Sequence, residues 1–175
     1  GLNDILSKLF GNKSQRDLKE INPYVDKIKK AYPAIESLSN DELRAKSAEI
    51  RQKVLDYVAT ERSKITELKE SVEGLEIDQR EEIWEEIDRL EKEVTEKFEV
   101  ILEEILPEAF SIVKDTTRRL TQNEEIVVKA TDFDRELAET HDFVDIDGDN
   151  AISYNRWVAG GNEILWDMIH YDVQL

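Results

Sequence analysis

An apolar stripe with helical spacing runs through residues 39–120, and it constrains the fold more than any other feature. Apolar side chains recur there every three or four positions, whereas a strand would need strict alternation. Gly74 can adopt the left-handed conformation that ends a helix, and Asp78 can cap the next one. We therefore predict two long antiparallel helices, residues 40–73 and 79–106, folded as a hairpin. The stripe consists of Leu43, Ile50, Val54, Val58, Ile65, Leu68, Val72, Leu75, Ile83, Ile87, Leu90, Val94, Phe98, Ile101 and Ile105.

Shorter helices are expected before this hairpin. Gly11 should end an amphipathic helix at the N-terminus, and Ser14 should begin a second helix. Pro23 removes a backbone donor and should kink or split that second helix, and Pro33 should stop it. The sequence therefore predicts that several short helices precede the hairpin.

The boundaries of the hairpin also have local signals. Ser39 is a good cap, because Glu42 at the third helical position can return a hydrogen bond to it. Pro107 is suited to the first turn of a further helix over residues 108–120. We expect this helix to pack beside the hairpin.

After Thr121 the pattern changes, and short extended pieces replace the long helical stripe. The predicted fold class is mainly α: a long antiparallel helical hairpin, shorter N-terminal and following helices, and a small irregular or β-containing C-terminal part. The expected C-terminal elements are a strand over residues 125–129, one or two helical turns over 132–139, a strand-like piece over 152–157, a turn at Gly160 and Gly161, and a helical or extended segment over 164–171.

Charge is distributed unevenly along the chain. The net charge is −17, which argues against nucleic acid as a partner of the whole surface. Residues 61–104 carry 17 acidic and 7 basic side chains, whereas residues 1–30 carry 7 basic and 4 acidic ones. The first thirty residues are therefore the part that can meet an anionic surface.

The N-terminal ten residues form an amphipathic pattern with Lys8 opposite the apolar side. One interpretation is a short helix that docks on its own protein. The other is a helix that lies in a membrane interface, helped by Lys8, Lys13 and Arg16. The candidate membrane-contact residues are Leu2, Ile5, Leu6, Lys8, Leu9, Phe10 and Lys13.

The loop that starts at Asp145 resembles a calcium-binding loop only in part. Asp145, Asp147 and Asp149 occupy ligand positions one, three and five. Asn150 replaces the glycine at position six, and Arg156 replaces the bidentate glutamate at position twelve, where a cation repels calcium. A turn between two extended segments is the favoured interpretation.

Catalytic and metal-binding patterns are scarce. The chain has no cysteine, which excludes thiolate zinc sites and cysteine nucleophiles. His141 and His170 are the only histidines, and no spacing marks a triad or a metal site. We predict no catalytic residue and no metal site within these 175 residues.

The final ten residues have the side-chain types of a base-binding pocket. An aromatic ring and a methionine can pack on an adenine, and the Gln174 amide can both donate and accept hydrogen bonds at its edge. An ordinary buried segment is the alternative interpretation.

Four stretches together resemble the SecA family of preprotein-export ATPases. Tyr171-Asp172-Val173-Gln174-Leu175, after Met168 and His170, is similar to the "hFDVQL" element that precedes the TGEGKT phosphate loop of that family. The other stretches are LSKLFGNKSQRDLKEIN at 6–22, LSNDELRAKSAEIR at 38–51 and LPEAFSIVKDTTRR at 106–119. Tyr171 replaces the usual phenylalanine, residues 59–100 and 121–164 are longer than the usual pattern, and the phosphate loop is not included.

The resemblance implies that the whole protein hydrolyses ATP with Mg²⁺ and pushes preproteins through the SecYEG channel from the cytoplasmic side of the membrane. It implies that the N-terminal helix binds anionic lipid. It also implies that Gln174 contacts the adenine and that Met168, His170 and Tyr171 line the base pocket. We expect the 175 residues alone to be inactive.

The resemblance also suggests three parts of the chain. Residues 1–38 would form the N-terminal helix and a linker helix, and residues 39–120 the hairpin with its packing helix. Residues 121–175 would lead into the nucleotide-binding domain. Two other functions remain open from the residues alone, namely a helical coiled-coil scaffold and a calcium-responsive module.

Overall fold

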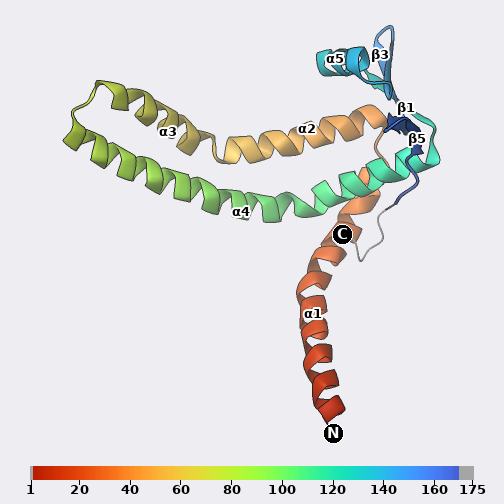
Figure 1. The fold of residues 1–175 in the computed structure, drawn as a ribbon, viewed down its shortest axis with the longest axis horizontal. Coiled ribbons are helices and arrows are strands. Elements are labelled where there is room, and N and C mark those ends of the chain that lie inside the picture. Colours follow the sequence, from red (N-terminus) through yellow and green to blue (C-terminus); the bar gives the residue numbers. More distant parts are fainter. Residues whose placement is uncertain (1, 170–175) are drawn as a thin grey trace. The chain divides into compact units, whose positions relative to one another are not determined.

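The structure of the chain is a computed structural model that describes the backbone of residues 2–169 and the side chains of residues 15–169 (Figure 1). The chain is mainly helical, with two small antiparallel sheets near its C-terminal end, as predicted. It divides into two compact units. Unit 1 consists of Gly1–Arg44 and Pro107–Leu175, and unit 2 is Ala45–Leu106.

The first helix, α1 (Leu2–Glu36), is one continuous element. The predicted end at Gly11, the split at Pro23 and the stop at Pro33 are therefore wrong, whereas a kink at Pro23 stays a prediction. A proline removes only its own N–H from the helical ladder, so the turns on either side can still form. Packing after Pro23 favours continuation, because Ile28 and Ile35 are both almost fully buried.

The capping signal before α2 (Asn40–Tyr57) is confirmed. The backbone N–H of Glu42 donates to the Ser39 hydroxyl at 3.1 Å, and the Ser39 N–H donates to the Glu42 carboxylate at 2.8 Å. This reciprocal pair satisfies two backbone donors that a helix start leaves unpaired. The start of α2 is thus fixed by the local sequence.

Unit 2 is an antiparallel helical hairpin, but its first arm is not a single helix. The arm consists of the unit 2 part of α2, α3 (Ala59–Ser71) and a 3₁₀ turn, η1 (Val72–Gly74), with a break at Val58 between α2 and α3. Val58 is completely buried, and the Arg62 N–H still donates to its carbonyl oxygen. The prediction of one helix over 40–73 is therefore wrong in detail, although the hairpin itself is present.

The turn of the hairpin also differs from the prediction. Positive φ angles occur among the described glycines at Gly148, Gly160 and Gly161, and Gly74 is not one of them. The second long helix, α4 (Ile77–Gln122), begins one residue before Asp78, which therefore lies in the first turn instead of capping it.

Pro107 lies inside α4, which runs on to Gln122 as one helix. The separate helix that was predicted over residues 108–120 is therefore the last part of α4. The Ser111 hydroxyl donates to the Pro107 carbonyl oxygen at 2.7 Å, which is an ordinary intrahelical contact for serine. The division between the two units coincides with this proline.

The apolar stripe forms the core of unit 2. Ile65 of α3 packs with Ile87 and Leu90 of α4, and Leu68, Ile83 and Val94 surround them. Ion pairs at the surface connect the two arms: Lys53 with Glu104 at 2.6 Å, Lys64 with Glu86 at 3.6 Å, and Lys69 with Glu91 at 3.2 Å. The Lys53–Glu104 and Lys69–Glu91 pairs run in opposite order along the two arms, as antiparallel helices require.

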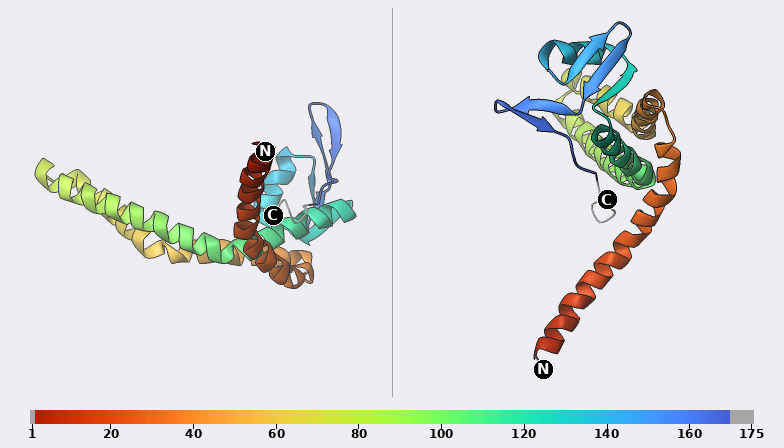
Figure 2. Two further views of the ribbon diagram at one scale, coloured as in Figure 1. Left: turned by 90° about the horizontal axis from the view of Figure 1, so that it is seen from below. Right: turned by 90° about the vertical axis from the view of Figure 1, so that its right-hand side faces the viewer.

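The C-terminal part of unit 1 contains the strands (Figure 2). The order in the first sheet is β1-β3-β2, all antiparallel, and β4 and β5 form a separate hairpin. The predicted strand 125–129 and the predicted turns at 132–139 are confirmed, whereas the strand-like piece 152–157 is divided at Asn155. The elements are β1 (Glu125–Lys129), α5 (Asp132–Thr140), β2 (Val144–Asp147), β3 (Asn150–Tyr154), β4 (Arg156–Ala159) and β5 (Asn162–Leu165).

Two tight turns connect these strands. Gly148 has φ of 57° between β2 and β3, and Gly160 and Gly161 have φ of 59° and 80° between β4 and β5. Two central residues with positive φ are typical of a type I′ hairpin turn, which matches the twist of its strands. The predicted turn at Gly160 and Gly161 is confirmed, and the segment after 164 is extended up to Leu165.

Candidate functional site

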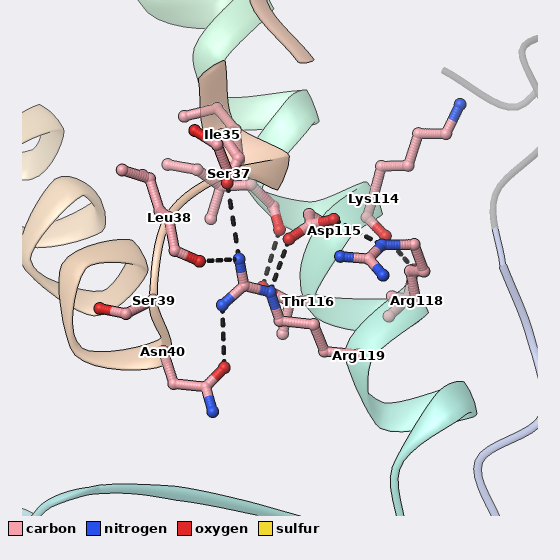
Figure 3. Close-up of polar contacts among 12 residues, drawn as sticks. Ile35, Ser37, Leu38, Ser39, Asn40, Lys114, Asp115, Thr116, Arg118 and Arg119 are labelled. Carbon is pink, nitrogen blue, oxygen red and sulfur yellow. Dashed lines mark hydrogen bonds and ion pairs between the residues drawn. The ribbon is translucent and has the colours of Figure 1, made fainter. Parts of the chain in front are cut away.

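A buried carboxylate joins three helix ends in unit 1 (Figure 3). The Asp115 side chain has no exposed surface and accepts three hydrogen bonds. Arg118 Nε donates at 2.7 Å, Arg119 Nε at 2.6 Å and the Tyr32 hydroxyl at 3.0 Å. We call Tyr32, Asn40, Asp115, Arg118 and Arg119 the Asp115 cluster.

Arg119 extends this cluster to the link between α1 and α2. Its guanidinium donates to the carbonyl oxygen of Leu38 at 2.5 Å and to Asn40 Oδ1 at 2.8 Å, and it reaches the Ile35 carbonyl at 3.5 Å (Figure 3). Ile35 lies in the last turn of α1, where carbonyls lack an intrahelical partner, and Leu38 lies in the link that follows. One arginine therefore fixes the end of α1 and the start of α2 against α4.

Electrostatics keep this cluster ionised. Burial alone would raise the pKa of Asp115, but the hydrogen bonds from Arg118, Arg119 and Tyr32 outweigh it and lower that pKa. Burial and the nearby Asp115 carboxylate raise the pKa of the Tyr32 hydroxyl. The cluster thus has a charged acceptor and fixed donors, and nothing in it acts as a free nucleophile or base.

A second ion pair fixes the small sheet to the start of α2. Arg44 donates two hydrogen bonds to the Asp134 carboxylate, at 2.6 and 2.8 Å. These bonds, together with those from Thr131, hold the pKa of Asp134 at about 2. The Lys129 N–H also donates to Asp41 at 2.8 Å. The first turns of α2 are therefore tied to β1 and α5.

The C-terminal segment is attached to the end of α4. The Thr121 hydroxyl, in the last turn of α4, donates to the Met168 carbonyl oxygen at 3.1 Å. Trp166 Nε1 donates to the same oxygen at 3.0 Å, and the Trp166 N–H donates to the Asn155 carbonyl at 2.7 Å. Residues 166–168 are therefore positioned by α4 and by Asn155, the residue before β4.

Of the predicted adenine-side residues, the structure describes Met168 alone. Its side chain is 46% exposed, so it is available to a ligand and is not part of the core. His170, Tyr171 and Gln174 lie outside the described residues. The predicted base pocket therefore stays a prediction, although its first residue is exposed.

The predicted membrane-contact residues lie on the first turns of α1. Leu2, Ile5, Leu6, Lys8, Leu9, Phe10 and Lys13 all belong to this helix, and their side chains lie outside the described part. The next side chains are described: Leu18 is 53% and Ile21 52% exposed. This stretch of α1 does not bury its apolar side against the described chain. Every helix within residues 2–169 is too short or too polar to cross a membrane.

The aspartate-rich loop is the turn between β2 and β3. Asp147 pairs with Asn150 across a two-residue connection, and the Tyr154 hydroxyl donates to Asp145 at 2.8 Å. No group of acidic or histidine side chains within the described residues could hold a metal ion. The His141 ring packs against Phe143 at a tilt of 55°, with ring centroids 4.9 Å apart. The favoured interpretation, a turn between two extended segments, is confirmed.

The Asp115 cluster was not predicted from the sequence. Its one local signal is the spacing of Asp115, Arg118 and Arg119, which places both arginines one turn from the carboxylate. Tyr32 and Asn40 are about 80 residues away in the chain, and nothing local indicates them. Spacing alone would have suggested an ordinary surface ion pair.

Comparisons with known proteins identify the family. A family model described as the SecA DEAD-like domain matches residues 6–175. Curated relatives named protein translocase subunit SecA are 66% identical in Porphyromonas gingivalis strain ATCC 33277 and 61% identical in Parabacteroides distasonis, each over the whole chain. A relative of the same name in Flavobacterium psychrophilum is 46% identical over 99% of the chain. No solved structure matches the chain.

These alignments cover residues 59–100 and 121–164 as well, so these relatives share the parts that are longer than the usual pattern. The chain spans 16% of the length of the relatives in Porphyromonas gingivalis and Parabacteroides distasonis. It corresponds to their N-terminal part. The chain belongs to the SecA DEAD-like domain family.

Proposed function

We propose that this chain is the beginning of an ATP-driven motor that exports preproteins through the SecYEG channel. The family membership over the whole chain carries this proposal, because the relatives are protein translocase subunits. In this motor the chain contributes two things: the membrane-facing helix and one side of the nucleotide pocket. ATP and Mg²⁺ are its cofactors, and the motor works at the inner face of the cell membrane.

The nucleotide side of the proposal depends on the segment after Trp166. Two donors hold the Met168 carbonyl oxygen while its side chain remains exposed. We expect Gln174, six residues further on, to read the adenine edge, with Met168, His170 and Tyr171 around the base. An amide side chain suits adenine because it both donates and accepts. The Asp115 cluster supports this segment only indirectly, through α4 and Thr121.

The test uses the full-length protein, with ATP and GTP compared. Gln174→Ala should weaken ATP binding about tenfold, as expected for one lost bidentate base contact. GTP binding should change little, because guanine does not present the same hydrogen-bond donor and acceptor at its edge as adenine. Gln79→Ala, at the exposed start of α4, is the matched control. Equal loss for ATP and GTP would contradict a role in reading the base.

The 175-residue chain alone should not bind nucleotide measurably. It contains the base side of the pocket, whereas phosphate and Mg²⁺ contacts provide most nucleotide affinity. A calorimetric titration with MgATP is the measurement. Micromolar affinity would show that the phosphate-binding groups lie within these residues.

The membrane side of the proposal depends on α1. Its first turns have an amphipathic and basic sequence, and Leu18 and Ile21 further along the helix are exposed. An amphipathic basic helix binds anionic interfaces through apolar burial and charge. We expect weak binding to vesicles that contain anionic lipid, and this binding should weaken as salt is added.

Vesicle flotation tests this with a charge-matched pair of variants. Lys8→Glu should abolish the flotation of the chain with anionic vesicles. Lys92→Glu, an exposed lysine of α4 in unit 2, should leave it unchanged. Equal flotation with neutral vesicles would remove the electrostatic part of the proposal.

A further inference from the structure

A cavity of about 420 Å³ lies beside the β4–β5 hairpin in unit 1. It opens where β1 starts, β3 ends and β4 begins. Two backbone hydrogen bonds at Asn155 fix this corner: its N–H donates to the Glu124 carbonyl at 3.0 Å, and its carbonyl accepts from Trp166 at 2.7 Å. The walls include Glu124, Glu125, Asp142, Tyr154, Trp157 and Glu163.

The charge in this cavity is strongly negative. Four carboxylates and a single guanidinium, that of Arg156, line it. Arg156 lies within 3.3 Å of Glu163 and 3.9 Å of Glu124, so it neutralises one side of the cavity. Among the side chains of residues 15–169, neither Glu125 nor Asp142 has a hydrogen bond or ion pair. Two carboxylates therefore remain available to a cation.

The aromatic rings of Tyr154 and Trp157 form another wall, and both rings are held in place by neighbouring side chains. Trp157 packs against Trp166 with ring centroids 6.3 Å apart, and the Tyr154 hydroxyl is fixed by its bond to Asp145. The face of an aromatic ring attracts ammonium and guanidinium groups through its quadrupole, and this attraction is stronger for tryptophan than for tyrosine or phenylalanine. Carboxylates beside an aromatic face are the chemistry that recognises a cation on an aliphatic stem.

We propose that this cavity binds a lysine or arginine side chain of a polypeptide. Its volume is at the lower end of the range for small-ligand sites, which suits one long side chain better than a folded surface. Among the described strands β5 pairs with β4 alone, so its other edge offers backbone groups to such a segment, and Glu163 of β5 lines the cavity. The cavity repels anions, so this site is distinct from the proposed nucleotide pocket and does not depend on it.

The experiment is a titration of the 175-residue chain with a short capped peptide that contains two lysines and two arginines among glycines. The double variant Glu125→Gln/Asp142→Asn should weaken binding about tenfold, because two carboxylates near the cation are neutralised. The double variant Glu81→Gln/Glu85→Gln removes the same charge from the exposed surface of α4 and should change binding less than twofold. Equal losses in the two variants would overturn the site in favour of a general acidic surface.

Two further measurements make the result decisive. Trp157→Leu should also weaken peptide binding. Thermal melts followed by circular dichroism show whether each variant folds like the parent chain. If Trp157→Leu does not fold, the carboxylate variants still test the site. Spermidine has the same cationic groups without a peptide backbone, and we expect it to compete poorly. Spermidine binding that is as tight as peptide binding, and lost in the Glu125→Gln/Asp142→Asn variant, would overturn the polypeptide as ligand.

Discussion

Replacing Asp115 by asparagine tests the buried cluster most directly. The substitution keeps the shape of the side chain but removes its charge and turns one acceptor into a donor that faces donors. Arg119 is only 7% exposed, so its charge would stay buried without a carboxylate. Breaking a buried ion pair in this way costs about 3–5 kcal/mol. Because Arg119 also donates to the Leu38 carbonyl and to Asn40, we expect about 3 kcal/mol.

The measurement is urea unfolding followed by tryptophan fluorescence. Trp84 belongs to unit 2, whereas Trp157 and Trp166 belong to unit 1, so a Trp84→Phe background reports unit 1 alone. A loss of about 3 kcal/mol lowers the urea midpoint by about 1–2 M for a unit of this size. Glu139→Gln, an exposed carboxylate on α5, is the control and should shift the midpoint very little. A loss below about 1 kcal/mol for the Asp115 variant would refute the view that the cluster carries a buried charge.

Three further changes test other parts of the chain. The pKa of Asp134 is about 2 in the fold and near 3.8 otherwise, so its pair with Arg44 stabilises unit 1 above pH 4 and is lost as the pH falls towards 2. Asp134→Asn should cost about 1 kcal/mol at pH 7 and flatten this acid dependence in urea unfolding; an unchanged pH slope would contradict it. Ser39→Ala should cost about 1 kcal/mol, since Glu42 loses its capping partner, and a midpoint equal to that of the parent would exclude this role for the cap. Pro107→Ala restores a helical donor and should stabilise α4 by about 1–3 kcal/mol, seen as slower amide exchange around the substitution; faster exchange would mean that the proline is needed there.

Signals that act over a few residues were predictable from the sequence. Ser39 and Glu42 satisfy each other's backbone groups whatever the rest of the chain does, and the structure contains both bonds. Gly160 and Gly161 likewise need no distant partner, because positive φ is easy for glycine alone. The strand at 125–129 was identified from its composition, and its partner β3 overlaps the predicted strand-like piece at residues 152–154.

Helix stops were the part that local rules predicted badly. Pro23, Pro33 and Pro107 each remove one hydrogen bond, and all three lie inside helices. Burial of apolar side chains on both sides of a proline can outweigh that single loss, but the amount of burial depends on segments far away in sequence. The break at Val58 is the opposite case: the apolar stripe continues through it, yet the helix is interrupted where the side chain is completely buried.

The Asp115 cluster connects the C-terminal segment, through α4, to the link between α1 and α2. Its carboxylate holds Arg118 and Arg119 on α4, and Arg119 holds the link between α1 and α2. Thr121 follows within one helical turn and donates to Met168. The path from the α1–α2 link to the proposed adenine side is thus a continuous series of hydrogen bonds and one helix turn. Local sequence shows the two ends of this path, and only the fold brings them together.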